Sequence, residues 1–219
     1  MKQEDYLAFP NTNNFDALLD SFCHDEQNKY YYHNLTPCGW DIEKYLIATS
    51  KGLVKREKSK LAIQTTLKGK LTFEENVRDT IRSSGYKFNQ YLDKAGYYLI
   101  EFHSFEACPE FFLINYHSGE KLRFSGYPFF SPDETQVLVA DYDYGLGWCT
   151  NSFSWWKLVN NNWVESVNYK PNNWGIEDAK WINETTVVAR IGYITNRKNP
   201  GEEKFFVRME MVGNNNTKK

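Results

Sequence analysis

Two carboxylates lie two residues apart in the stretch Ala140-Asp141-Tyr142-Asp143-Tyr144-Gly145. On an extended chain Asp141 and Asp143 would face the same side, as calcium binding or an acid–base pair requires. The alternative is a polar strand end that runs into a glycine loop. The sequence favours this structural role, because it shows no third acidic ligand close by and no Asp-rich calcium loop. They are the only carboxylate pair that we nominate for chemistry.

A second group of reactive residues surrounds Cys108, which has His103, Glu106 and Glu110 as sequence neighbours. A cysteine, a histidine and a carboxylate can hold a metal ion or activate a thiolate. Pro109 follows Cys108 directly, which favours a solvated loop instead. A metal-dependent hydrolase around His103 is therefore our third and least favoured hypothesis. The favoured solvated loop predicts no metal and no cofactor.

Aromatic residues are concentrated between positions 142 and 174. They are Tyr142, Tyr144, Trp155, Trp156, Trp163 and Trp174. Such rings serve as stacking platforms for carbohydrate or as anchors in protein interfaces. The alternative is core packing. Adjacent Trp155 and Trp156 must point to opposite faces of a strand, so at most one belongs to the core. The other ring is the best indication of a binding surface in the sequence.

Composition excludes several classes of function. The chain has 219 residues and a formal net charge of −2, so no global field attracts nucleic acid or an anionic membrane. No apolar run approaches the roughly 18 residues of a membrane-spanning helix. Phosphate-loop, nucleophile-elbow, zinc-protease and dinucleotide-binding motifs are absent from the sequence. The N-terminal stretch lacks the apolar core of an export signal. We expect a cytoplasmic protein if Met1 is native, and a periplasmic or surface protein if a signal was removed.

The first 85 residues predict a mixture of helix and strand. Phe15, Leu18, Leu19 and Phe22 recur at helical spacing, after an N-cap at Asn13 or Asn14. Residues 45–48 and 61–67 read as strands. Thr72 and Glu75 match a capping box, and Gly85 suits a left-handed helix end, which predicts a short helix over 73–84.

From residue 86 onward the patterns indicate β-strands almost throughout. The predicted strands are 97–102, 111–116, 121–124, 137–140, 154–159, 163–167, 186–191 and 205–209. Ser118-Gly119 supplies the positive φ that a hairpin needs between the second and third of these.

The β-rich part contains an internal repeat. Phe130–Ala140 and Trp181–Ala189 both read as an aromatic residue, an Asp or Asn turn, Glu-Thr and an apolar strand. Residues 91–100 form a weaker third copy. Phe111-Phe112, Trp155-Trp156 and Phe205-Phe206 each open a later strand of their copy. A unit of 40 to 50 residues with this order suits one blade of a β-propeller.

The stretch Pro128-Phe129-Phe130-Ser131-Pro132-Asp133-Glu134, followed by an apolar strand, resembles the signature of TolB-like and related WD-repeat propellers. The family has Gly where Glu134 stands, and the Gly-His and Trp-Asp dipeptides of true WD repeats are absent. The resemblance covers residues 86–212 and implies a mainly β fold of propeller-like blade units. Three such units do not close a ring. We therefore expect an antiparallel meander, either an open or incomplete propeller or a sandwich, with two short helices in the N-terminal half.

The predicted organisation has three parts. Residues 1–85 form an α+β segment packed on the body, residues 86–213 form the repeat-containing meander, and residues 214–219 form a disordered tail. Under the repeat alignment Cys108 and Cys149 occupy comparable loops. Two alternatives stay open for them, separate reduced thiols or, in an exported protein, a disulfide between the two.

Three hypotheses of function follow. The first is a non-enzymatic, protein-binding module, of which bacterial immunity proteins that neutralise a toxin are one kind. The second is a carbohydrate-binding or carbohydrate-processing module that uses the Trp and Tyr rings, and the third is the hydrolase. A protein partner is the expected ligand, glycan is the alternative, and neither nucleic acid nor a membrane span is expected.

Overall fold

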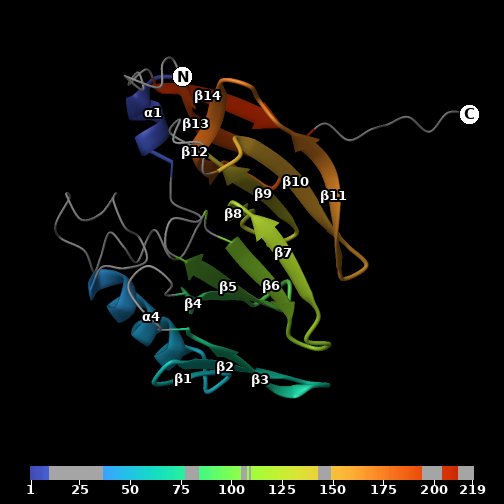
Figure 1. Cartoon of the computed structure of the whole chain (residues 1–219). Coiled ribbons are helices and arrows are strands. Elements are labelled where there is room, and N and C mark those ends of the chain that lie inside the picture. Colours follow the sequence, from blue (N-terminus) through green and yellow to red (C-terminus); the bar gives the residue numbers. More distant parts are fainter. Residues whose placement is uncertain are drawn as a thin grey trace, which may run out of the picture. The chain divides into compact units, whose positions relative to one another are not determined.

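The computed structural model describes residues 1–9, 37–76, 84–104, 108, 110–142, 149–193 and 204–211. Its contacts divide the chain into two compact units. We call Asn13–Pro128 the β1–β7 unit, and Met1–Thr12 with Phe129–Lys219 the β8–β14 unit. Each unit is built on two antiparallel sheets of consecutive strands (Figure 1).

The β1–β7 unit contains a three-stranded and a four-stranded meander. The first is made of β1 (Val54–Glu57), β2 (Lys60–Thr65) and β3 (Gly69–Glu74). The second is made of β4 (Ser84–Leu92), β5 (Tyr97–Ser104), β6 (Glu110–Asn115) and β7 (Lys121–Ser125). Tight turns join the strands, and Gly69, Gly96 and Gly119 supply the positive φ that these turns require.

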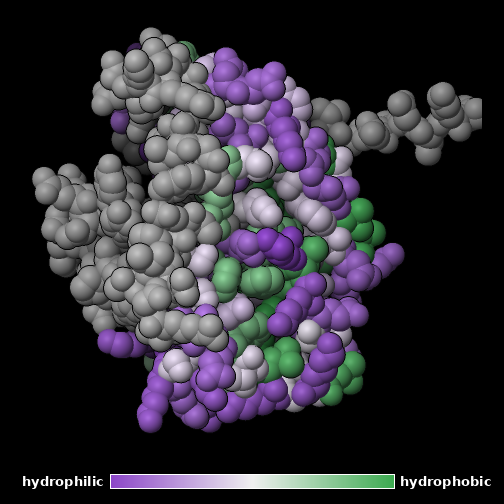
Figure 2. Space-filling view, in the orientation of Figure 1, coloured by the Kyte–Doolittle hydropathy of each residue, from purple (hydrophilic) through white to green (hydrophobic). Residues whose placement is uncertain are grey.

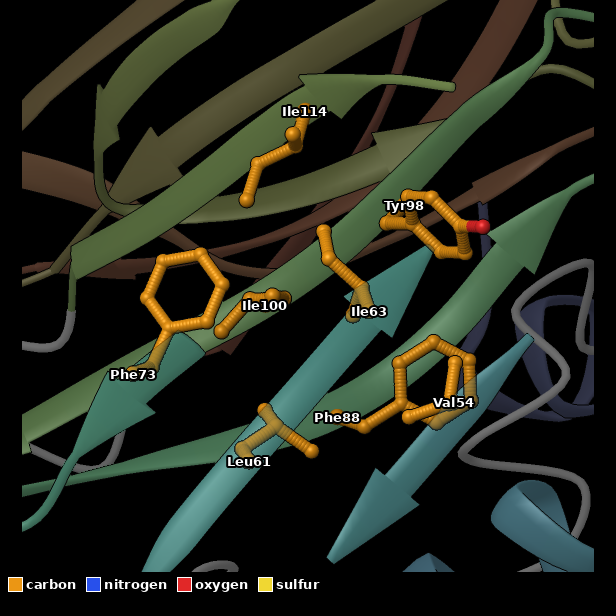
Figure 3. Packing of buried hydrophobic residues seen from close by; sticks show 8 residues of the cluster. All are labelled: Val54, Leu61, Ile63, Phe73, Phe88, Tyr98, Ile100 and Ile114. Atoms are coloured by element: carbon orange, nitrogen blue, oxygen red, sulfur yellow. The ribbon is translucent and has the colours of Figure 1, made fainter. Parts of the chain in front are cut away.

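An apolar core lies between these two meanders. Period-2 alternation directs Leu61 and Ile63 of β2 and Tyr98 and Ile100 of β5 into one buried cluster. Figure 3 shows these side chains pointing toward one another, together with Val54, Phe73, Phe88 and Ile114. The buried cluster holds the two sheets of this unit together.

Helix α4 (Pro37–Thr49) corrects the predicted strand at 45–48. Its buried and half-buried positions, Ile42, Glu43, Leu46 and Ile47, recur at helical spacing. Pro37 stands at the first helical position, which suits its fixed φ. A run of four apolar residues was too short to distinguish a strand from a helix. The helix contacts β1 and β4, and Figure 1 shows it beside them.

The predicted helix over 73–84 is wrong in its described part. Thr72 and Phe73 lie in β3, paired with Ala62 and Leu61 of β2, and Asn76 forms a β-bridge with Ser84. Cross-strand pairing has overridden the capping-box pattern, which was a local signal only. Gly85 lies inside β4 rather than at a helix end. Residues 77–83, and the helix predicted over 15–22, lie outside the described residues.

The β8–β14 unit repeats the same plan. One sheet consists of β8 (Tyr127–Phe130), β9 (Gln136–Asp141), β10 (Ser152–Val159) and β11 (Asn162–Tyr169). The other consists of β12 (Trp174–Trp181), β13 (Thr186–Tyr193) and β14 (Lys204–Glu210). Helix α1 (Gln3–Leu7) packs on the second sheet, where the Tyr6 hydroxyl donates to Asp178 Oδ2 at 2.7 Å.

The three copies of the repeat form equivalent hairpins. Residues 91–100, 130–140 and 181–189 fall at the β4–β5, β8–β9 and β12–β13 turns, each between the first and second strands of its sheet. Asp133 Oδ1 accepts the Thr135 amide at 3.2 Å, and Asn183 Oδ1 accepts the Thr185 amide at 2.9 Å. The repeat therefore encodes one Asx-turn geometry at two places.

Glu134 follows Asp133 in the turn between β8 and β9 and has a backbone conformation that is unusual for a residue with a side chain. Its φ is 60°, in the left-handed region that glycine enters without steric cost. Hydrogen bonds around Asp133 hold the turn in this shape. Burial alone would raise the pKa of Asp133, but hydrogen bonds from Ser131 and Thr135 to its carboxylate lower it.

The predicted fold class is confirmed: the described chain is mainly β, with antiparallel meanders and two short helices in the N-terminal half. The predicted strands from residue 97 onward are confirmed to within two residues at each end. The predicted boundaries at residues 85 and 213 stay predictions. In the described residues, no helix has the length and apolar character needed to cross a membrane.

Candidate functional site

Strand β11 is the one edge strand of the described sheets that carries no lysine, arginine or proline. Each of the four sheets ends in two edge strands, namely β1, β3, β4, β7, β8, β11, β12 and β14. Lysine, arginine and proline on an edge strand discourage pairing with a foreign strand. Every one of these edge strands except β11 contains at least one such residue. Asn162–Tyr169 contains none.

The side chains of β11 are unusually open to solvent for a strand of eight residues. Val164, Val167 and Tyr169 are 50%, 41% and 50% exposed. Figure 2 shows hydrophobic residues at the rim of the molecule where Figure 1 places β11. Large exposed apolar side chains that follow one another along an edge indicate an interaction site more than scattered ones do.

A β-bulge gathers these three side chains on one face of the sheet. Trp155 of β10 lies opposite Val167, and the next residue, Trp156, lies opposite Glu165, so that Ser166 is the extra residue. Val164 lies opposite Lys157 and Tyr169 opposite Phe153. Without the bulge, Val164 would point to the opposite face from Val167 and Tyr169.

Three aromatic rings continue this apolar strip at the end of β11. The ring centroids of Phe153 and Tyr169 are 5.6 Å apart. The centroid of the Trp174 ring lies 5.9 Å from that of Phe153 and 6.1 Å from that of Tyr169. We call Val164, Val167, Tyr169, Phe153 and Trp174 the β11 strip. It combines an open backbone edge with an aromatic end.

The predicted tryptophan platform is divided between core and surface. Trp155 is a core residue, since its ring packs edge-on against Trp181 at 5.1 Å and its Nε1 donates to Gln136 Oε1 at 3.0 Å. Trp156 is half-buried on the opposite face, where its Nε1 donates to Ser154 Oγ at 2.8 Å. The ring of half-buried Trp163 lies with its centroid 6.0 Å from the centroid of the Phe130 ring. None of the three belongs to the β11 strip.

The other predicted residues of this region are held by local contacts. Asp141 is buried, and its Oδ2 accepts the Thr150 amide at 3.1 Å. The ring of Tyr142 lies over Gly175 and Gly192, where added Cβ atoms would approach it to 2.5 Å. The two glycines pair across β12 and β13, and the ring occupies the space that their missing Cβ atoms leave. Asp143 and Tyr144 lie outside the described residues, so the paired arrangement of Asp141 and Asp143 stays a prediction.

Cys108 and Cys149 belong to different units of the chain. Their pairing in a disulfide stays a prediction from the repeat alignment.

The β1–β7 unit holds a separate network of buried charge. The Arg56 guanidinium contacts both oxygens of Glu43, at 2.7 and 2.8 Å, and its third nitrogen contacts Glu75 Oε1 at 2.6 Å. The network reaches the outer edge of β4: Glu43 Oε1 accepts the Phe88 amide at 2.7 Å, and Arg56 donates to the Tyr86 carbonyl. Side chains from α4 and β1 thus satisfy backbone groups that an edge strand otherwise presents to a partner.

Two further charged residues, Lys87 and Glu101, face each other across β4 and β5 and are almost fully buried. Burial raises the pKa of Glu101 to about 7, against the opposing attraction of Lys87 and a hydrogen bond from Asn89. Burial likewise lowers the pKa of Lys87, although Glu101 and Glu43 oppose that shift. Both shifts favour the neutral forms, as desolvation requires.

In the described part of the chain, His103 is not part of a metal-binding group of side chains. Its imidazole lies over Gly85, where an added Cβ would come within 2.8 Å of Nε2. Burial, together with Lys87 and Arg56, lowers the pKa of His103. No group of three ligand atoms includes it among the described residues. Glu110 instead pairs with Arg123 at 2.5 Å, and Glu106 lies outside those residues.

A hollow of about 440 Å³ on the first sheet is lined by residues of both charges. Its walls are Glu57, Lys60, Ala62, Lys70, Thr72 and Glu74. Lys60 and Glu74 form an exposed ion pair across it, at 3.3 Å. With one short apolar side chain in its walls, it offers little surface to an apolar ligand.

Two features of the sequence point to the β11 strip. The first is the absence of Lys, Arg and Pro over residues 162–169. The second is the out-of-phase spacing of Val164 relative to Val167 and Tyr169, which a bulge corrects. Both signals become informative only when the strand order identifies β11 as an edge.

Comparisons with protein-family models and with curated proteins find no match for this chain.

Proposed function

We propose that this chain is a non-enzymatic protein-binding module that contacts its partner through the β11 strip. The observation that carries the proposal is the contrast between β11 and the other edge strands of the described sheets. Alone among them it has no Lys, Arg or Pro, and it exposes Val164, Val167 and Tyr169 on one face. Such an edge favours association.

A partner-neutralising role, of the kind that bacterial immunity proteins have, is the form of binding that we favour. A small module that binds through the β11 strip can cover a functional surface of a larger protein. We propose further that the blade-like sheets, with their matching turns at Asp133 and Asn183, form a rigid support of the TolB-like kind for this strip. Rigid supports reduce the entropy lost on binding.

Genomic context supplies the partner for a direct test. The product of the neighbouring gene is co-expressed with the wild-type chain and with two variants, and complex formation is measured by light scattering after gel filtration. Val167→Lys places a charge in the strip. Val207→Lys is the matched control, because Val207 is 37% exposed on the edge strand β14 of the same unit.

We expect the wild type and Val207→Lys to form the complex and Val167→Lys to lose it. A complex that survives Val167→Lys, or that both lysine variants abolish equally, would contradict binding through the β11 strip.

Carbohydrate binding is a second candidate function, favoured by the Phe153, Tyr169 and Trp174 rings. Tyr169 is half-exposed, and its ring is inclined by only 33° to that of Trp174. Two such rings can stack on a sugar. Titration with a panel of soluble glycans tests this alternative, which predicts a change in tryptophan fluorescence that Tyr169→Ala removes. An unchanged signal throughout the panel argues against it.

A further inference from the structure

We infer that the partner binds by adding an extended strand of its own to the outer edge of β11. This inference rests on the proposed function and specifies the chemistry of the partner. The occupant is a segment of about eight residues from another protein, with apolar side chains at alternate positions and a lysine or arginine near Glu165.

The backbone of β11 is the first reason. Strand β11 ends the order β11-β10-β9-β8, and no described strand pairs with its outer side. An edge strand directs alternate N–H and C=O groups away from its sheet, and an added strand can bond to each of them. The edge of β4 differs, because Glu43 accepts its Phe88 amide and Arg56 donates to its Tyr86 carbonyl.

The side chains of β11 are the second reason. The bulge at Ser166 brings Val164, Val167 and Tyr169 to one face, so an added strand would extend a single apolar surface. Side chains on neighbouring strands of a sheet contact one another in cross-strand pairs. Alternate apolar residues of the partner would therefore cover the three exposed side chains.

Charge is the third reason, and it selects among partners. Glu165 is the only charged residue in Asn162–Tyr169. It is exposed, and Asn168 Nδ2 donates to its Oε1 at 2.7 Å. A like charge directly opposite on an added strand would be unfavourable, whereas a cation would be favourable. The edge thus fits an uncharged or basic strand and disfavours an acidic one.

A selection from a display library of random twelve-residue peptides tests the inference. The folded, full-length chain is the bait, and the enriched peptides are synthesised and titrated calorimetrically. We expect an apolar alternation with a basic residue and few acidic ones. We also expect affinity to fall at least tenfold with Val167→Lys and to stay unchanged with Val207→Lys. Circular dichroism confirms that both variants are folded.

Methylation of single backbone nitrogens in the peptide separates strand addition from side-chain docking. An N-methyl group removes a donor and obstructs pairing. Strand addition predicts a loss of about tenfold or more at alternate residues and little change at the residues between them. Affinity that tolerates methylation at every position, while still requiring Val167, overturns strand addition and leaves protein binding through the strip intact.

The remaining outcomes are also decisive. Peptides that bind Val167→Lys as well as the wild type contradict both strand addition and the proposed use of the β11 strip. A selection without enrichment overturns strand addition, while the co-expression experiment still decides the proposed function. If the chain alone forms a dimer that Val167→Lys dissociates, the occupant is a second copy and the inferred partner is wrong.

Discussion

The edge strands β4 and β11 meet the same physical problem in opposite ways. Among the described strands, each pairs with a neighbour in its sheet on one side only, and Ser84 of β4 forms one further bridge to Asn76. In β4, the Phe88 amide donates to Glu43, the Tyr86 carbonyl accepts from Arg56, and Lys87 points into the protein. In β11 there is no Lys or Arg, and Val164, Val167 and Tyr169 are exposed beside polar Asn162, Glu165, Ser166 and Asn168.

The two edges differ in whether charged side chains bond to their backbone groups. An ion pair at a buried edge costs desolvation free energy, which good geometry and additional hydrogen bonds must offset. The β4 edge has both features, since Glu43 and Arg56 also bond to the Phe88 amide and the Tyr86 carbonyl. The β11 edge has no such ion pair, and no described strand pairs with its outer side. An edge of this kind is a liability unless a partner uses it. We therefore regard β4 as a structural edge and β11 as a functional one.

Opening the β4 edge should have the largest effect on stability. Arg56→Met leaves the Glu43 carboxylate buried, with an exposed fraction of only 1%, and without its cation. Removal of one partner from a buried ion pair typically costs about 3–5 kcal/mol of unfolding free energy. Urea unfolding followed by circular dichroism measures the loss.

Lys60→Met is the matched control for Arg56→Met, because Lys60 and Glu74 form an ion pair whose side chains are 53% and 62% exposed. Exposed pairs contribute less than about 1 kcal/mol. Equal losses in the two variants would show that the network at the β4 edge is no more important than a surface pair.

The second largest effect should be a dependence of stability on pH. The pKa of Glu101 is about 7 in the folded chain against an ordinary 4.5. Between these values the folded state holds a proton that the unfolded state releases, so stability falls as pH rises from 4.5 to 7. Glu101→Gln should remove this fall, which amounts to roughly 3 kcal/mol.

His103 acts with the opposite sign in part of that range. Its lowered pKa means that the unfolded state binds more protons just below pH 6.5, so its contribution to stability increases as pH rises toward 6.5. The informative quantity is thus the difference between wild type and Glu101→Gln at each pH, since both proteins retain His103. A difference that stays constant from pH 4.5 to 7 would mean that Glu101 titrates normally.

The contrast between these edges was only partly predictable from the sequence. Turn chemistry located the hairpins, because the Asx turns at Asp133 and Asn183 and the positive φ of Gly119 depend on nearby residues. Helix α4 was missed, although Ile42 and Leu46 have helical spacing. Its docking on β1 and β4 is a tertiary effect that no local pattern contains.

The candidate site was even less accessible to sequence analysis. Trp155 and Trp156 were expected to separate between two environments, and the structure places one in the core and one half-buried. The edge position of β11 depends on sheet order, which the sequence leaves open. Lys87 alternates with apolar Tyr86 and Phe88, the usual pattern of a half-exposed strand, so its burial opposite Glu101 could not be inferred.

The smallest expected effect on stability belongs to β11. Val167 is 41% exposed, and Val167→Lys should change the free energy of unfolding by no more than about 0.5 kcal/mol. This result would separate a functional edge from a structural one, because the same substitution is expected to abolish partner binding. A loss of 2 kcal/mol or more in urea unfolding would instead assign Val167 to the core.

Amide hydrogen exchange of the free chain, resolved residue by residue by NMR, tests the difference between the two edges most directly. We predict that the outward-facing Phe88 amide of β4 is strongly protected, because it donates to the buried Glu43, and that Arg56→Met reduces this protection. We predict that alternate amides of β11, over Asn162–Tyr169, exchange rapidly while those facing β10 are protected. Uniform protection along β11, or rapid exchange at Phe88 in the wild type, would contradict a closed β4 edge and an open β11 edge.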